Sequence, residues 1–127
     1  MNVHAHQAYK KTQVSTASQG DLIVMLFDAA IRFAKQAKER IDDQDFEQAH
    51  QKIVRVQDIM DELTSALRMD VGDIARNLEQ LYGFVSDQLL QANMKKEKVH
   101  LDQALQILLE LRDTWAQVVA KPYAGNH

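Results

Sequence analysis

Two pairs of residues in this chain have a spacing that could bind metal. Glu47 and His50 form one Glu-x-x-His sequence, and Glu97 and His100 form another. In di-iron helical bundles, two helices each supply a Glu-x-x-His sequence, and the other two helices each supply a Glu that points inward. The two spacings therefore raise the hypothesis of a di-iron site, and with it of an enzyme.

The helices that would carry these residues argue against such a site. At 100° per residue, Glu47 lies roughly 160° from the centre of the apolar face of its helix, and His50 roughly 100° from it. The first helix would have to offer Glu39, which belongs to its polar face, and the third helix has no Glu at the matching end, only Asp87. Metal ligands must converge on the interior of a bundle. We therefore expect no metal site, and we place His50 and His100 at the surface or on a flank.

Composition limits the remaining chemistry. The chain has 127 residues, with no Cys, four Gly and one Pro. Without Cys there is no disulfide framework, no zinc–thiolate site and no thiol nucleophile. The glycines are isolated, so they form no phosphate-binding loop, and no Gly-x-Ser-x-Gly sequence presents a nucleophilic Ser. We therefore expect a protein that is not an enzyme and needs no cofactor.

Charge and hydropathy exclude two classes of partner. The formal net charge is −3 at pH 7, which provides no general attraction to nucleic acid. The dense basic cluster of Lys95, Lys96 and Lys98 is expected to be a solvated loop. The N-terminus lacks the apolar stretch of a signal peptide, and no apolar run has the length of a membrane span. These features predict a cytoplasmic protein with no membrane insertion.

The pattern of apolar residues predicts an all-α fold. Pro122 is the single Pro of the chain, so the residues before it contain nothing that forbids a helix interior. Periodic apolar positions predict helices over about 19–41, 46–67, 74–92 and 99–120. Four helices with short connections favour an antiparallel, up-down-up-down four-helix bundle.

The chain divides into an N-terminal arm over 1–17, a bundle over 18–121 and a flexible C-terminal tail over 122–127. The arm is rich in His, Gln, Ser and Thr and has no helical periodicity, so we expect it to be mobile. Ser18 is the predicted N-cap of the first helix, and Asp45 that of the second. The break between the third and fourth helices is predicted at residues 93–98.

Each helix is expected to bury one apolar face. The first helix is apolar over an arc of roughly 200°, well above the usual width, so it must be covered on more than one side. In the other helices the predicted core positions recur every three or four residues, which suits nearly antiparallel packing. These positions are Phe46, Ala49, Ile53, Val56, Met60, Leu63 and Leu67; Ile74, Leu78, Leu81, Val85, Leu89 and Ala92; and Leu101, Leu105, Leu108, Leu111, Trp115 and Val118.

Apolar side chains also occur outside these faces. They are Ile23, Val24, Val54, Phe84, Leu90, Ile107 and Leu109. A single exposed apolar residue needs no explanation. A small bundle that is apolar over too wide an arc, however, can oligomerise, fold its arm over itself or receive a partner helix. The sequence therefore favours binding of a partner protein over catalysis.

Three stretches of the chain form a distinctive pattern in their order and spacing. They are Ala8-Tyr9, Val14, Thr16-Ala17-Ser18 and Leu22 to Asp28; Gly72, Ile74-Ala75, Asn77-Leu78, Leu81-Tyr82 and Leu89 to Asn93; and Leu108, Leu111-Arg112 and Trp115. Together they resemble the FliS family of flagellar secretion chaperones, from about residue 8 to 119. An unrelated helical bundle with a regulatory or binding role is the alternative interpretation, and a di-iron enzyme is a distant third.

The resemblance implies a cytoplasmic bundle that binds newly made flagellin. Such a protein holds the C-terminal region of flagellin as helices on its apolar surface, prevents premature polymerisation and presents flagellin to the flagellar export apparatus. Other flagellar regulators are further candidate partners. A segment that folds on binding can wrap a large area through many modest contacts, which agrees with the wide apolar surface of this chain.

The resemblance also indicates where a partner binds. In the family, a Tyr of the N-terminal arm folds back over the bundle, and Tyr9 corresponds to it. We expect Tyr9 and Val14 to dock on the first and fourth helices beside a partner groove, and Tyr82 and Trp115 to lie in the core. The complete set of predicted partner-binding residues is Tyr9, Val14, Ile23, Val24, Val54, Ile107 and Leu109.

Overall fold

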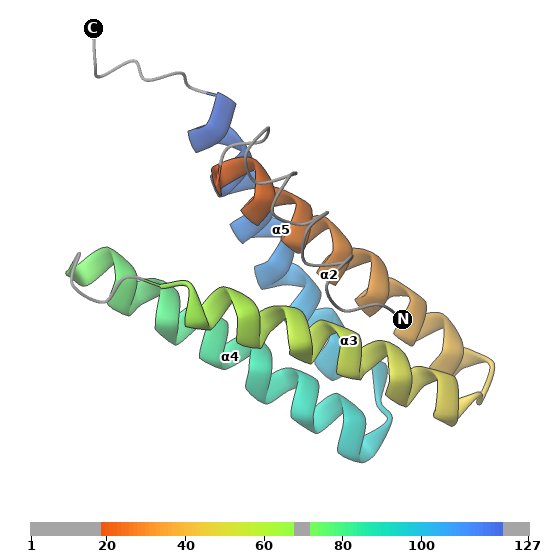
Figure 1. Ribbon diagram of the computed structural model, residues 1–127. Helices are drawn as coiled ribbons and strands as arrows, with labels where there is room; N and C mark the ends of the chain where they lie inside the picture. The colour runs from red at the N-terminus through yellow and green to blue at the C-terminus, as the bar shows by residue number, and fades with distance from the viewer. Residues whose placement is uncertain (1–18, 68–71, 121–127) are drawn as a thin grey trace, which may run out of the picture.

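The computed structural model describes residues 19–67 and 72–120, which form four α-helices (Figure 1). The helices are α2 (Gln19–Asp42), α3 (Phe46–Ser65), α4 (Asp73–Lys95) and α5 (Lys98–Ala120). Successive helices run in opposite directions, and each packs mainly against two others: α2 and α4 each contact both α3 and α5. The prediction of an all-α antiparallel four-helix bundle is confirmed.

The connections at residues 43–45 and 96–97 are shorter than the sequence suggested. The side chain of Asp45 accepts a hydrogen bond from the Gln48 backbone N–H at 3.2 Å, which confirms the predicted cap of α3. The break expected at 93–98 is wrong in extent, because α4 continues to Lys95. Lys96 then ends the helix in the left-handed conformation, with φ at 53°. Its ammonium donates hydrogen bonds to the backbone and side-chain oxygens of Asn93, which stabilise a turn that usually needs Gly.

One apolar core runs through the bundle. Its buried members are Phe27, Ala30, Ile31, Ala34 and Ala37 of α2; Ile53, Val56, Met60 and Leu63 of α3; Tyr82, Val85, Leu89 and Ala92 of α4; and Leu101, Ala104, Leu105, Leu108 and Leu111 of α5. Because α2 packs against both α3 and α5, its wide apolar arc is covered on two sides, as predicted. Within the two described ranges, no helix has an apolar stretch that could cross a membrane.

Four predicted core positions are exposed instead; they are Phe46, Ile74, Leu81 and Val118. Phe46, Ile74 and Val118 lie in the first or last turn of a helix, where fewer neighbouring helices remain to cover a side chain. Tyr82, the next residue along α4, is buried in the core in place of Leu81. Both residues are spaced to follow Leu78 on a helical face, and the ring of Tyr82 packs edge-on against Phe27, with centroids 6.1 Å apart.

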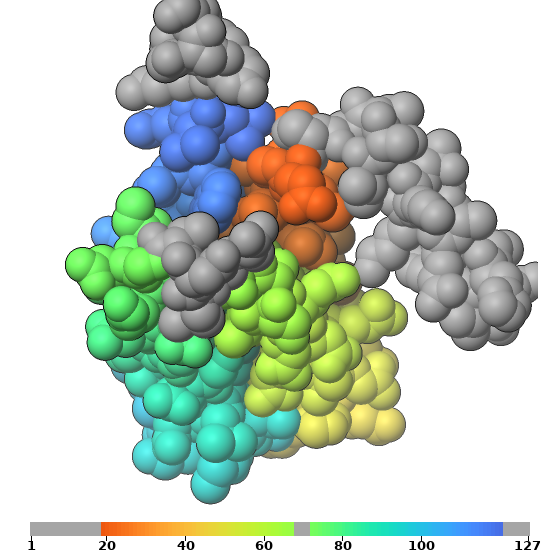
Figure 2. Space-filling model, turned by 60° about the vertical axis from the view of Figure 1, so that its left-hand side comes forward, coloured from red at the N-terminus to blue at the C-terminus, as the bar shows by residue number. Residues whose placement is uncertain are grey.

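The two ends of the bundle differ in how closely the helices approach. The α2–α5 pair and the α3–α4 pair diverge towards the end where α2 begins (Figure 1). Figure 2 shows the start of α2 and the end of α5 standing together above the α3–α4 pair. We refer to this end as the open end. The opposite end, with the connections 43–45 and 96–97, is the loop end.

The predicted arm and tail, the cap Ser18 and the stop at Pro122 lie outside the described residues. The division into arm, bundle and tail therefore stays a prediction.

Candidate partner-binding site

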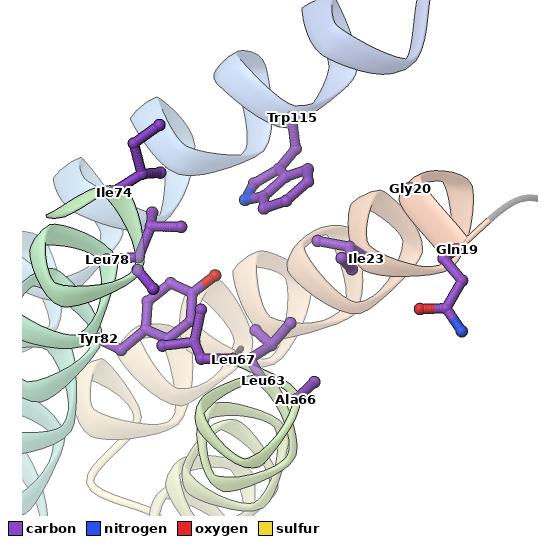
Figure 3. A pocket seen from close by; sticks show the side chains of 11 residues that line it. Gln19, Gly20, Ile23, Leu63, Ala66, Leu67, Ile74, Leu78, Tyr82 and Trp115 are labelled. Atoms are coloured by element: carbon purple, nitrogen blue, oxygen red, sulfur yellow. The ribbon is translucent and has the colours of Figure 1, made fainter. Parts of the chain in front are cut away.

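An apolar cavity of about 360 Å³ opens between the four helices at the open end (Figure 3). All four helices contribute to its wall, together with the two residues that follow α3. The lining residues are Gln19, Gly20, Ile23, Leu63, Ala66, Leu67, Ile74, Ala75, Leu78, Tyr82 and Trp115. A concave, mostly apolar site with a few polar groups is the usual form of a binding pocket.

Side-chain size explains why the cavity lies at this end. Towards the loop end, the inward positions hold small residues, which include Ala34, Ala37, Ala49, Ala92 and Ala104. The spacing between helix axes depends on the side chains at the contact, so alanines allow close approach. At the open end the inward positions include larger and only half-buried residues, which are Ile23, Leu67, Leu78 and Trp115, beside the small Ala66 and Ala75.

Tyr82 and Trp115 provide the polar groups in the interior of the cavity. Tyr82 is only 2 % exposed, and Figure 3 shows its hydroxyl directed into the space below Trp115. Burial raises the pKa of the Tyr82 hydroxyl, and a hydrogen bond with the Trp115 side chain opposes that rise. The raised pKa keeps the hydroxyl protonated. Because an indole N–H can only donate, the Tyr82 oxygen accepts from Trp115, and its own O–H can donate to a group that enters the cavity. The prediction that Tyr82 lies in the core is confirmed, whereas Trp115 packs against the core but is half-buried.

A second, shallower hollow lies on the outer side of α4 and α5. It has a volume of about 500 Å³ and is lined by Asn77, Gln80, Leu81, Phe84 and Ile107. Asn77 and Leu81 of the hollow neighbour Leu78 of the cavity along α4. The two apolar surfaces therefore adjoin each other across this helix.

The structure separates the predicted partner-binding residues into three groups. Ile23 lines the cavity and Ile107 lines the outer hollow. Val24 and Val54 are half-buried and line neither surface, and Leu109 is 42 % exposed on α5, away from both. Tyr9 and Val14 lie outside the described residues.

Sequence reasoning missed most of the cavity wall. Leu67, Ile74, Leu78 and Trp115 were predicted to be core residues, because their spacing continues the buried faces of α3, α4 and α5. Leu63 was also predicted to be in the core, which is confirmed, and it reaches the wall as well. The available signal was their position within about two turns of a helix end, since a bundle has fewest neighbours there. How far the helices diverge cannot be inferred from spacing alone.

Both Glu-x-x-His sequences lie at the loop end, and the histidine of each contacts a side chain of α4. The Nδ1 atom of His50 lies 3.0 Å from Oδ1 of Asn93, between α3 and α4. The Nδ1 atom of His100 lies 3.1 Å from Oε1 of Gln88. Its Nε2 atom lies 3.3 Å from Oε1 of Glu97. Among residues 19–67 and 72–120, no three His, Asp or Glu side chains are grouped so that they could hold a metal ion.

Relatives of known description match nearly the whole chain. The family model "Flagellar protein FliS" matches residues 1–122. The chain is 37% identical over 117 residues to "Flagellar secretion chaperone FliS" of Vibrio cholerae, a match that covers 88% of this chain and 86% of the relative. It is 25% identical over 122 residues to the protein of the same description from Bacillus subtilis, covering 96% and 91%.

A solved structure shares the fold. It is described as "Crystal structure of flagellar chaperone from bacteria", and it superimposes with a TM-score of 0.76 at 18% sequence identity. The superposition covers 91% of this chain and 98% of the other.

Proposed function

The chain belongs to the FliS family of flagellar secretion chaperones, a family without enzymatic activity, and we propose that its open end binds the C-terminal region of flagellin. In this proposal the protein acts in the cytoplasm, where it prevents flagellin from polymerising too early. It then presents flagellin to the flagellar export apparatus, and other flagellar regulators are further candidate partners.

The apolar cavity at the open end carries this proposal. An amphipathic helix binds by inserting apolar side chains, one turn apart, into a hydrophobic groove. The cavity offers apolar walls from all four helices, among them Ile23 of α2, Leu67 after α3 and Leu78 of α4. Its walls are mostly apolar, so a helix can bury apolar side chains there, and the Tyr82 O–H can donate one hydrogen bond to the bound segment.

The outer hollow supports a longer binding path. Because the cavity and the hollow adjoin across α4, a flagellin segment that becomes helical on binding can run from Ile23 in the cavity to Ile107 in the hollow. Val24, Val54 and Leu109 line neither surface, so in this proposal they contact the partner only where it extends beyond this path. Tyr9 and Val14 of the arm are proposed to contact the bundle beside the cavity.

A peptide titration tests the proposal. A peptide from the C-terminal region of the cognate flagellin is added to the intact protein, and binding is followed by circular dichroism and calorimetry. We expect saturable binding, a gain in helix content and a negative heat-capacity change, because a disordered segment folds on apolar surface. No saturable binding by the folded protein would overturn the proposed function.

Two matched substitutions locate the site. Ile74→Asp and Val99→Asp each replace an exposed β-branched residue at the second position of a helix, α4 and α5 respectively. Asp is tolerated in the first turn of a helix, so both variants should fold. Ile74 lines the cavity, so burying its carboxylate under a peptide should weaken binding about tenfold or more. Val99 lies at the loop end, and its variant should bind as the parent does; equal losses would exclude the cavity as the site.

A further inference from the structure

A cluster of cations surrounds one aromatic ring between α2 and α3. Phe33 is half-buried against the core. The Cζ atoms of Arg32 and Arg55 lie 5.2 and 5.6 Å from the centroid of its ring, and the Nζ atom of Lys52 lies 5.6 Å from it. We refer to these four residues as the Phe33 patch. Each contact has the distance of a cation–π interaction.

The cations of this patch, Arg32, Lys52 and Arg55, have no ion-pair partner among residues 19–67 and 72–120. On the other side of α2 the cations are paired with α5, through Lys38 with Asp102, Lys98 with Asp42 and Arg112 with Asp28. The quadrupole of one ring offsets only part of the repulsion between three cations. The Phe33 patch is therefore locally positive on a chain whose net charge is −3.

A hollow beside the patch contains unsatisfied polar atoms. It has a volume of about 230 Å³ and is lined by Gln36, Glu39, Arg40 and Lys52, so it shares Lys52 with the patch. Oε1 of Gln36 and Nε of Arg40 are buried without a hydrogen-bond partner. The other end of the Arg40 guanidinium pairs with Asp43 at 2.9 Å. Buried unsatisfied polar atoms are rare in folded proteins. One of these two atoms is an acceptor and the other a donor, so the group of the hollow that suits a carboxylate is the Lys52 ammonium.

We propose that the Phe33 patch and this hollow bind a short acidic segment of a partner protein. A carboxylate of the segment is held by the Lys52 ammonium and the Arg55 guanidinium at the edge of the hollow. The four residues of the patch come from two antiparallel helices that the core holds in place, so the cations are presented at a fixed spacing. Charge-assisted hydrogen bonds of this kind are stronger than those between neutral groups.

The surroundings of the patch favour a short protein segment over a long polyanion. Glu39 lines the hollow, and Asp58 lies one helical turn beyond Arg55 on α3. A nucleic acid or an anionic membrane would bring negative charge against both residues. A peptide can place its carboxylates between them.

The proposed site is separate from the cavity. Phe33 lies about 15 Å along α2 from Ile23, at a rise of 1.5 Å per residue. An acidic partner can therefore bind the α2–α3 face while the open end is occupied. Testing the free chaperone alone keeps this inference independent of flagellin binding.

The test uses a fluorescently labelled, Glu-rich peptide and a copy with Gln in place of every Glu. Fluorescence anisotropy is measured with the full chain in the absence of flagellin. We expect saturable binding of the Glu peptide, weakened by salt, and no binding of the Gln copy. Absence of saturable binding would overturn the proposal. So would tighter binding of a single-stranded DNA oligonucleotide or of phosphatidylserine vesicles.

Two substitutions distinguish the site from general attraction. Arg55→Gln and Lys95→Gln each remove one exposed positive charge, the second at the loop end of α4. Arg55→Gln should weaken binding about tenfold, the loss expected from one hydrogen bond between charged groups. Lys95→Gln should change it less than about twofold. Circular dichroism checks that both variants fold, and equal losses would overturn the proposed site.

Discussion

The loop end and the open end of this bundle are stabilised by different interactions. At the loop end, small buried residues bring the helices close together, and polar side chains connect them. Lys98 pairs with Asp42 at 2.6 Å between α5 and α2, and His50 lies 3.0 Å from Asn93 between α3 and α4. At the open end, large apolar residues are half-buried around a cavity. The two ends share the same four helices but differ in packing.

This difference separates stability from binding. We expect the closely packed end, with its polar links between helices, to hold the topology, because regions with many buried contacts open least often. Half-buried apolar side chains at the other end can be covered further by a partner. A chaperone built this way can bind and release a segment without losing its fold.

The largest expected effect is the loss of stability when a buried core side chain at the loop end is truncated. Leu101→Ala removes a fully buried side chain near the start of α5 and should lower the free energy of unfolding by about 2–5 kcal/mol. Leu78→Ala at the cavity should cost clearly less, because that side chain is only half-buried. Urea denaturation measures both. Equal losses would mean that the two ends contribute alike to stability.

The next effect concerns partner affinity at the open end. Trp115→Ala should weaken binding of the flagellin peptide by about 2 kcal/mol, since large aromatic residues in a pocket dominate binding energy. Trp115 is the one Trp of the chain, so in the parent protein its fluorescence should shift to shorter wavelength when the peptide covers it. An unchanged spectrum at saturation would place the peptide away from the cavity.

A smaller effect is expected from the polar links of the loop end. Asn93→Ala removes the partner of His50 and an acceptor for Lys96, and it should lower the free energy of unfolding by about 1 kcal/mol. Hydrogen exchange should accelerate at the end of α4, while peptide affinity stays the same. Faster exchange around Trp115 instead would show that the two ends are coupled.

The smallest effect is a pH dependence at both ends. Burial raises the pKa of Tyr82 above its ordinary 10.0, so the folded chain keeps the phenolic proton to a higher pH than the unfolded chain. The linked stability is fully present below pH 10.0 and is lost as the pH rises through the folded pKa. The hydrogen bond and the charge of Asp42 raise the pKa of Lys98 above 10.5. The stability linked to this group is likewise lost as the pH rises.

Tyr82→Phe separates these two contributions. The variant should lose less stability than the parent protein when urea unfolding is repeated at increasing pH above 10.0. An identical decline in both proteins would assign the alkaline loss to groups other than Tyr82.

Local spacing predicted the helices well because helix formation depends on nearby residues. The positions of α2, α3 and α5 and the Asp45 cap follow from apolar periodicity and capping chemistry. The end of α4 was misplaced, because a Lys side chain stabilised a left-handed turn that sequence rules assign to Gly or Asn. The choice of Tyr82 over Leu81 for the core depended on Phe27, which is distant in the sequence.

The partner site was predicted less completely than the fold. Ile23 and Ile107 were identified as apolar residues outside the main buried faces, and each lines one of the two apolar surfaces. Leu67, Leu78 and Trp115 were assigned to the core, although they form the cavity wall. The cations around Phe33 gave no signal in the sequence, because Lys52 and Arg55 reach the ring from another helix.

By itself, the sequence determined the fold class, the antiparallel order of the helices and the absence of common catalytic motifs. These depend on residue types and on spacings within one helix, which are local properties. Only the tertiary structure decided which end of the bundle opens, which apolar residues line the cavity and which cations gather around Phe33. Those features depend on how far apart the helices stand, and that distance is set by the side chains of several helices packing together.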